Sequence, residues 1–226
     1  MKLYMHPMST TSRTVLLFLE DQGIKVDQQV VDLFTGEHQK PQFTAVNPSR
    51  MVPVLEDDGF RMTESSAILK YIADKMNSPA YPKDLKKRAK VNEIMDWFNS
   101  NFYRDYGYGV VYPQLFPGHK RPSDAVQAAT LAWHKERSQN WLKILNDAIL
   151  GMGARQKYVA GDDITIADYF ASEILAVGEG TCLDCAKYPN VARWMNTMRS
   201  LPAWAKVNGP FEGWIASLKD RKFETV

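Results

Sequence analysis

The chain has 226 residues, of which 45% are hydrophobic and 24% are charged, with a formal net charge of +2. The apolar fraction is large enough for a packed core, which excludes a disordered chain, and the length fits one large domain or two small ones. The near-balanced charge argues against nucleic-acid binding. The longest apolar run near the start, residues 15–19, is too short to cross a membrane, and two cysteines are too few for a disulfide scaffold, so we expect a cytoplasmic protein.

In chain order, the first third alternates between strand and helix. Hydrophobic periods of 2 and 3.6 residues separate the elements, Gly23 ends a helix, and Asp57-Asp58-Gly59 is a hairpin turn signal. The predicted elements are a strand over residues 3–5, a helix over 12–22, a strand over 26–30, hairpin strands over 52–56 and 60–62, and a helix over 65–75. This βαβ-ββα order predicts a small α/β domain over residues 1–76.

The remainder of the chain is helical in period. Prolines at positions 79 and 82 break the pattern, and Thr165 and Asp168 form a capping box ahead of a buried apolar stripe. The predicted helices cover residues 85 to about 108, 123–150, a segment behind the capping box, 190–200 and 203–220. We therefore expect a linker over residues 77–87 and an all-α domain over 88–226.

Two short segments suit a ligand that resembles a peptide. Val52-Pro53 stands at the start of a predicted strand, where proline leaves the Val52 backbone free to pair with an extended chain. Glu64 and Ser65 open a helix directly after a strand, where free amides attract a carboxylate and Glu64 can accept from an ammonium group. An ordinary edge strand and plain capping by Ser65 explain the same residues equally well.

A polar loop, residues 8–13, leads from the first strand into the first helix. Any of the hydroxyls of Ser9, Thr10, Thr11 and Ser12 can either cap that helix or donate a hydrogen bond to a bound thiolate. Such a bond to a charged group contributes roughly 1.5–3 kcal/mol, enough to lower a thiol pKa by about one to two units. This chemistry needs no metal and no covalent cofactor.

Several motifs together resemble the glutathione transferase superfamily, and specifically a bacterial theta-like, serine-using member. The segment Ser9-Thr10-Thr11-Ser12-Arg13 is similar to the theta-class serine motif, and residues 47–55, NPSRMVPVL, resemble the segment that carries the family's cis-proline. Residues 63–72, TESSAILKYI, and 164–168, ITIAD, resemble two further family motifs. The motifs occur in the family's order and extend over nearly the whole chain.

The resemblance implies a thioredoxin-like N-terminal domain, an all-helical C-terminal domain and glutathione as co-substrate. It assigns thiol activation to Ser9, the γ-glutamyl end to Glu64 and Ser65, the cysteinyl unit to Val52, and the glycyl end to His38. It also places Met51 at the site, where relatives often carry Lys or Gln. The implied reaction joins the glutathione thiolate to a small hydrophobic electrophile, and the implied assembly is a homodimer.

Some expectations stay open at this stage. The aromatic stretch between residues 102 and 116 offers Tyr106 and Tyr112 as residues of the electrophile pocket, and Asn99 is similar to a beta-class position that reaches across a dimer. Cys182 and Cys185 have redox spacing but lie in the helical half, so a structural pair is the better interpretation. A glutathione-dependent dehalogenase or isomerase, or a non-catalytic binding module, is the alternative to conjugation.

Overall fold

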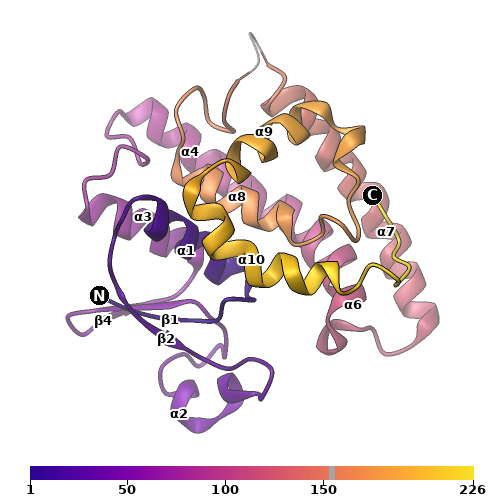
Figure 1. Cartoon of the computed structure of the whole chain (residues 1–226), viewed down its shortest axis with the longest axis horizontal. Helices are drawn as coiled ribbons and strands as arrows, with labels where there is room; N and C mark the ends of the chain where they lie inside the picture. Colours follow the sequence, from indigo (N-terminus) through magenta and orange to yellow (C-terminus); the bar gives the residue numbers. More distant parts are fainter. Residues whose placement is uncertain (153–155) are drawn as a thin grey trace.

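The structure is a computed structural model that describes residues 1–152 and 156–226. Its N-terminal part is a four-stranded sheet in the order β2-β1-β3-β4, in which β1 and β2 are parallel and β3 and β4 are antiparallel to their neighbours (Figure 1). The strands are β1 (Lys2–Met5), β2 (Asp27–Val30), β3 (Val54–Asp57) and β4 (Phe60–Met62). The helices of this part are α1 (Thr10–Asp21), the 3-10 turn η1 (Glu37–Gln39), α2 (Pro41–Thr44) and α3 (Ser65–Lys75). The expected βαβ-ββα order is confirmed.

The two faces of the sheet pack against different helices because neighbouring strand residues point in opposite directions. Leu3 and Met5 belong to the main core, together with apolar residues of α1 and α3. Tyr4, between them, packs edge-on against Phe43 of α2 in a second, smaller cluster that also contains Val54. The short β1 strand therefore joins both hydrophobic layers.

A helical part follows. The segment between α3 and α4 comprises residues 76–84, and the first helix after it begins at residue 85, as predicted. A nearly continuous helical run consists of α4 (Leu85–Trp97), the π-helical turn η2 (Phe98–Phe102), α5 (Tyr103–Asp105), the π-helical turn η3 (Tyr106–Val111) and α6 (Tyr112–Leu115). After the 3-10 turn η4 (Pro117–His119), the remaining elements are α7 (Asp124–Lys143), η5 (Ile144–Ile149), α8 (Ile166–Ala176), η6 (Cys185–Lys187), α9 (Pro189–Arg199) and α10 (Pro202–Ala216).

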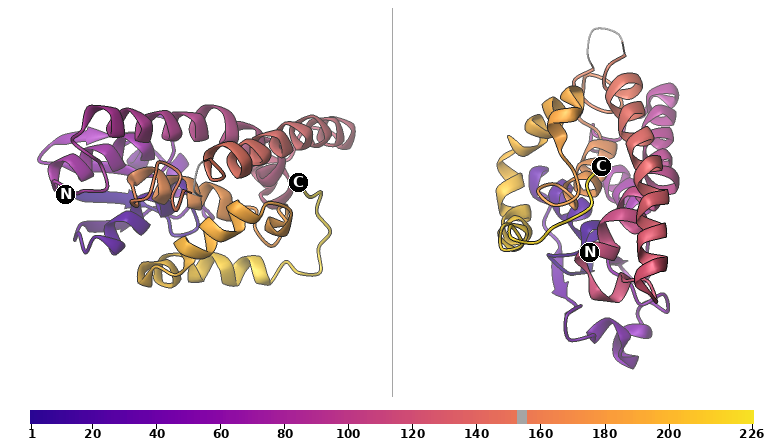
Figure 2. Two further views of the ribbon diagram at one scale, coloured as in Figure 1. Left: turned by 90° about the horizontal axis from the view of Figure 1, so that it is seen from above. Right: turned by 90° about the vertical axis from the view of Figure 1, so that its right-hand side faces the viewer.

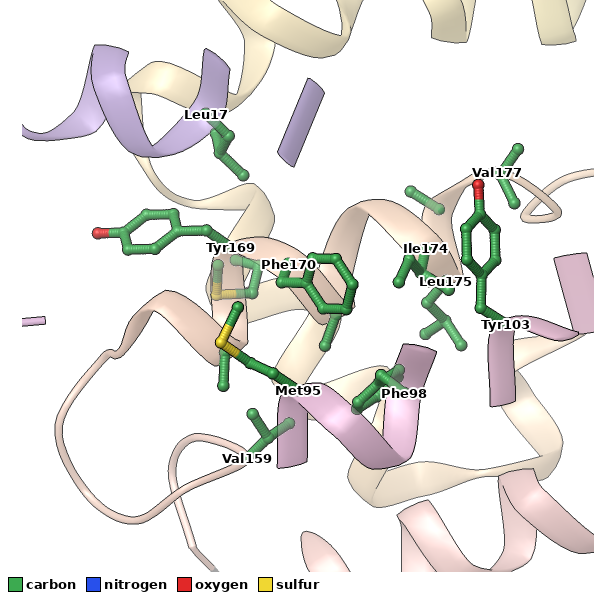
Figure 3. Close-up of a cluster of buried hydrophobic side chains, with 14 of the residues drawn as sticks. Leu17, Met95, Phe98, Tyr103, Val159, Tyr169, Phe170, Ile174, Leu175 and Val177 are labelled. Atoms are coloured by element: carbon green, nitrogen blue, oxygen red, sulfur yellow. The ribbon is translucent and has the colours of Figure 1, made fainter. Parts of the chain in front are cut away.

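Helix α8 is the centre of the molecule. Every residue from Ile166 to Ala176 is buried, so the helix is covered by the rest of the chain on all sides and not only on the predicted stripe. Figure 3 shows Phe170 and Ile174 of α8 between Leu17 of α1 and Phe98 of the α4 run. The views in Figure 2 place α4 and α7 along one side of the molecule and α10 along the other, with α8 between them.

The capping box in front of α8 is present and connects more of the chain than its own helix. The Asp168 carboxylate accepts hydrogen bonds from the Thr165 amide at 2.8 Å, the Val159 amide at 2.9 Å and Trp194 Nε1 at 3.0 Å. Burial raises the pKa of this carboxyl to about 6, and its hydrogen bonds oppose the shift by favouring the charged form. Asp168 thus ties α8 to the preceding loop and to α9.

A buried ionic cluster joins α1 to α8 and α10. Arg13 Nη1 lies 3.1 Å from Glu173 Oε2 and donates to Asn208 Oδ1 at 2.6 Å, while Asn208 Nδ2 donates to Glu173 Oε1 at 2.7 Å. All three side chains are fully buried. A buried charge requires such partners, so these bonds hold α1, and the loop before it, against the helical part.

Among the described residues, no helix has both the length and the apolar character that a membrane crossing requires.

Candidate active site

A cleft of about 390 Å³ opens where the first turn of α3, the segment before β3 and the helical run meet. Its lining residues are Thr11, Asn47, Met51, Val52, Pro53, Thr63, Glu64, Ser65, Ser66, Asn99, Ser100, Tyr103, Arg104 and Tyr108. The cleft brings together four of the residues expected at the site, namely Met51, Val52, Glu64 and Ser65. These come from both sides of the β3–β4 hairpin, so the hairpin turn is what places them side by side.

The N-terminus of α3 lines the cleft and has no side-chain cap. Glu64 occupies the N-cap with φ 66° and ψ 107°, an uncommon conformation for a residue other than glycine, and no side chain caps the helix. Ser65 is the first helical residue and not the cap, and the structure records no hydrogen-bond partner for its hydroxyl among the described residues. First-turn amides without an acceptor, together with the helix dipole, form a site for a carboxylate.

Backbone groups of Val52 face the same cleft. The Val52–Pro53 peptide bond is cis, as expected from the motif. The Val52 carbonyl accepts a hydrogen bond from Thr11 Oγ1 at 3.0 Å, whereas no partner for the Val52 amide is recorded within the described parts of the chain. Asn47 holds the preceding turn by donating to the Met51 carbonyl at 2.8 Å. The Val52 amide is therefore a donor available to an extended peptide.

The four candidate hydroxyls before and at the start of α1 differ in their burial and in their contacts. Ser9 is the N-cap of α1, accepts a hydrogen bond from the Ser12 amide at 3.3 Å, and is half-buried. Its hydroxyl lies 3.2 Å from that of Thr11, which lines the cleft. Thr10 and Ser12 are buried, at 3% and 0% exposure. Of the four hydroxyls, only that of Thr11 belongs to a residue lining the cleft; Ser9 does not line it and is next to it only through its contact with Thr11.

His38 does not line this cleft. It lies in the 3-10 turn η1 and is half-buried, on the chain that follows β2. Its Nδ1 atom is buried and has no hydrogen-bond partner among the described residues. A buried imidazole nitrogen without a partner is an unsatisfied polar group, which a ligand or an ordered water can complete.

The two tyrosines expected in the electrophile pocket, Tyr106 and Tyr112, do not line the cleft. Tyr106 is completely buried and its hydroxyl donates to the Leu175 carbonyl at 2.9 Å, so it is a core residue and not a pocket residue. Tyr112 is 8% exposed, does not line the cleft, and shares a hydrogen bond between hydroxyls with Tyr103. The tyrosines that do line the cleft are Tyr103 and Tyr108, whose rings are 5.0 Å apart.

Asn99 and Arg104 lie in the cleft of their own chain. Asn99 and Tyr103 are four residues apart, as are Ser100 and Arg104, a spacing in the sequence that could have indicated a common face. Arg104 is oriented by the buried Asp105, which also accepts from Arg137. Burial alone would raise the pKa of Asp105, but hydrogen bonds, led by that from Arg104, lower it to about 2. Asp105 therefore carries a full negative charge behind the cleft.

The two cysteines are remote from this site. Cys182 is fully buried, and burial raises the pKa of its thiol to about 11. Cys185 is partly buried, donates to Glu179, and its pKa is likewise raised by burial. Thiols that remain protonated at neutral pH are poor nucleophiles, which fits a structural pair.

Comparisons with known proteins identify the family. Residues 1–74 match the family model for the glutathione S-transferase N-terminal domain, and residues 121–202 match that for the C-terminal domain. A delta-class glutathione transferase from Nilaparvata lugens is 30% identical, with a TM-score of 0.77, over 96% of this chain and 97% of that one. A variant of human glutathione-S-transferase T1-1 is 29% identical, with a TM-score of 0.79, over 98% of this chain and 91% of that one.

A glutathione transferase homolog from sulfitobacter, crystallised with bound glutathione, shares the fold at 24% identity and a TM-score of 0.78, over 93% of this chain and 97% of that one. Both halves of the chain thus match in the expected order, and the insect relative is similar over nearly the full length of both proteins. The chain belongs to the glutathione transferase family and is an enzyme that takes glutathione as its co-substrate.

Proposed function

We propose that this enzyme is a theta-like, serine-using glutathione transferase that conjugates the glutathione thiolate to small hydrophobic electrophiles. The observation that carries the proposal is that one cleft is lined both by the uncapped N-terminus of α3, with Glu64 and Ser65, and by Val52, whose amide has no partner in the described parts of the chain. A scaffold that only kept the fold would need neither the open helix end, nor the free strand-edge donor, nor the Ser9 hydroxyl, so the three together argue against a non-catalytic module.

Glutathione carries separate groups for each part of this cleft. Its α-carboxylate suits the first-turn amides of α3 and the hydroxyl of Ser65, and its ammonium group suits the exposed carboxylate of Glu64. The cysteinyl unit pairs with the backbone of Val52, and the glycyl carboxylate extends toward His38. Met51 is exposed and offers no polar side-chain contact, so its part is limited to its backbone and its apolar surface.

The sulfur then lies near Ser9, whose hydroxyl donates to it. Thr11 has one hydroxyl proton, and it is already engaged with the Val52 carbonyl at 3.0 Å. The Ser9 proton is directed at a neighbouring hydroxyl at 3.2 Å, from which it can turn to a stronger acceptor such as a thiolate. The rings of Tyr103 and Tyr108 on the opposite wall give the electrophile an apolar surface.

Dehalogenation and isomerisation use the same activated thiolate and are the second candidate reactions. Reductive deglutathionylation is disfavoured because it requires a cysteine near position 9 or 10, where this chain has serine and threonine. We further propose a cytoplasmic homodimer and a division of the chain into domains 1–76 and 88–226, joined by residues 77–87.

The placement of glutathione is tested by calorimetry on Glu64→Ala and on the matched control Glu136→Ala. Glu136 is an exposed glutamate of α7 outside the cleft. We expect glutathione affinity to fall at least several-fold in Glu64→Ala and to stay unchanged in the control. Unchanged affinity in a folded Glu64→Ala variant would exclude this placement. Turnover of aryl halides, epoxides, isothiocyanates, alkyl halides and hydroperoxides then separates conjugation from the other reactions.

A further inference from the structure

The turn that leads into Ser9 is held by the side chain of His6. The Ser9 amide donates to the His6 carbonyl at 3.0 Å, which closes a four-residue turn with Pro7 at its second position, where proline is favoured. Inside this turn, the Met8 amide donates to His6 Nδ1 at 3.1 Å. The His6 amide in turn donates to Ser12 Oγ at 3.3 Å, so the turn is also fastened to the first turn of α1.

This arrangement has the connectivity of an Asx turn. In an Asx turn, a side-chain oxygen of Asp or Asn at the first position accepts from the amide two residues later. In this chain, the imidazole nitrogen of His6 takes the place of that oxygen. Because Nδ1 accepts, the ring is neutral and carries its proton on Nε2. An acceptor fixed in this way limits the conformations available to the residue that follows the turn, which is Ser9.

The surroundings of His6 keep its ring in the accepting state. His6 is 6% exposed, and its ring packs edge-on against Phe34 with centroids 5.2 Å apart. Burial lowers the pKa of this imidazole, and the opposing influence of Asp32 is the smaller one. The aromatic contact and the hydrogen bond are separate features of the same ring, so substitutions can remove one and keep the other.

We propose that His6 is a positioning residue for thiol activation: its Nδ1 fixes the turn that aims the Ser9 hydroxyl at the glutathione sulfur. This inference rests on the proposed role of Ser9. His6 touches neither the sulfur nor the electrophile, and acts only through the backbone of residues 7–9. The acceptor atom, and not the aromatic ring, is the functional part of the side chain.

Two substitutions separate the acceptor from the ring. His6→Phe keeps the ring and the contact with Phe34 but removes the acceptor, whereas His6→Asn removes the ring and supplies an acceptor for an Asx turn. The pKa of enzyme-bound glutathione is measured by ultraviolet titration of the thiolate, alongside kcat and the KM for glutathione with an electrophile that the wild type turns over. Thermal melting of each variant confirms that it is folded.

We expect His6→Phe to raise the bound thiol pKa by about half a unit to one unit and to lower kcat at neutral pH roughly three- to tenfold, the size of one lost hydrogen bond. The KM for glutathione stays close to the wild-type value, since the contacts at Glu64 and Ser65 are unchanged. His6→Asn retains the wild-type thiol pKa and kcat. A purely structural role would lower the melting temperature in both variants and leave the thiol pKa unmoved.

Either of two results would overturn the proposal: a folded His6→Phe with the wild-type thiol pKa, or a folded His6→Asn with a raised one. The second result is decisive even if the phenylalanine variant does not fold. Ser9→Ala is titrated in the same series. If Ser9→Ala leaves the thiol pKa unchanged, the proposed role of Ser9 itself is wrong. If Ser9→Ala raises the thiol pKa but His6→Phe does not, the role of Ser9 stands and only the role of His6 is wrong.

Discussion

In the proposed mechanism, replacing Ser9 by alanine removes two hydrogen bonds with different consequences. The first is the bond to the glutathione thiolate, which as a bond to a charged group contributes roughly 1.5–3 kcal/mol. At about 1.4 kcal/mol per pKa unit, its loss raises the bound thiol pKa by about one to two units and slows conjugation at neutral pH by about ten- to a hundredfold. Glutathione affinity changes much less, because the α3 and Val52 contacts remain.

The second bond is the N-cap of α1, in which Ser9 accepts from the Ser12 amide at 3.3 Å. Losing a serine cap to alanine costs about 0.5–2 kcal/mol of stability, whereas glycine at the same position costs only a few tenths. Ser9→Gly therefore removes the hydroxyl while nearly preserving the helix. We expect it to show the full rise in thiol pKa with a smaller fall in melting temperature than Ser9→Ala.

The assay is the ultraviolet titration of bound glutathione, combined with kcat measured under saturating glutathione. Thr11→Val is the matched control, because Thr11 lies 3.2 Å away and its proton is engaged with the Val52 carbonyl. We expect Thr11→Val to disturb the β3 edge but to leave the thiolate signal largely in place. If Thr11→Val abolished the signal while both Ser9 variants kept it, the reasoning from hydroxyl protons would be refuted.

Two further predictions concern the scaffold. Asp168→Ala should lower the free energy of unfolding by roughly 3–5 kcal/mol in urea titration, because four buried donors lose their acceptor; a loss below about 1 kcal/mol would show that the donors find other partners. Asp105→Asn should be less stable than the wild type at pH 7. The folded-state pKa of Asp105 is lowered to about 2. The difference in unfolding free energy between the two proteins should therefore persist down to about pH 4 and vanish as the pH falls through 2. A difference that is constant from pH 7 to 2 would contradict this assignment.

The sequence alone predicted the βαβ-ββα order, the all-helical remainder and the family, because those depend on local signals. Alternating strand residues, the Asp57-Asp58-Gly59 turn and the cap before α8 act within a few residues of each other. Glu64 and Ser65 could be recognised for the same reason, since an anion site at a helix start needs only a strand, a turn and a helix in succession. The start of helix α4 at Leu85 was also predicted, because its helical period begins directly after the prolines at 79 and 82.

The tertiary structure decided which tyrosines reach the cleft. The π-helical turns η2 and η3 lie within the run that carries them, and each π turn shifts the helix face relative to a regular period of 3.6 residues. Spacing could therefore not show that Tyr106 turns into the core while Tyr108 and the largely buried Tyr103 line the cleft. Long-range contacts also decided that Asp168 serves Trp194 of α9 as well as its own helix, and that α8 is buried on every side. These outcomes depend on which elements pack together across tens of residues, 69 between Tyr106 and Leu175 and 26 between Asp168 and Trp194, and a local pattern carries no information about that choice.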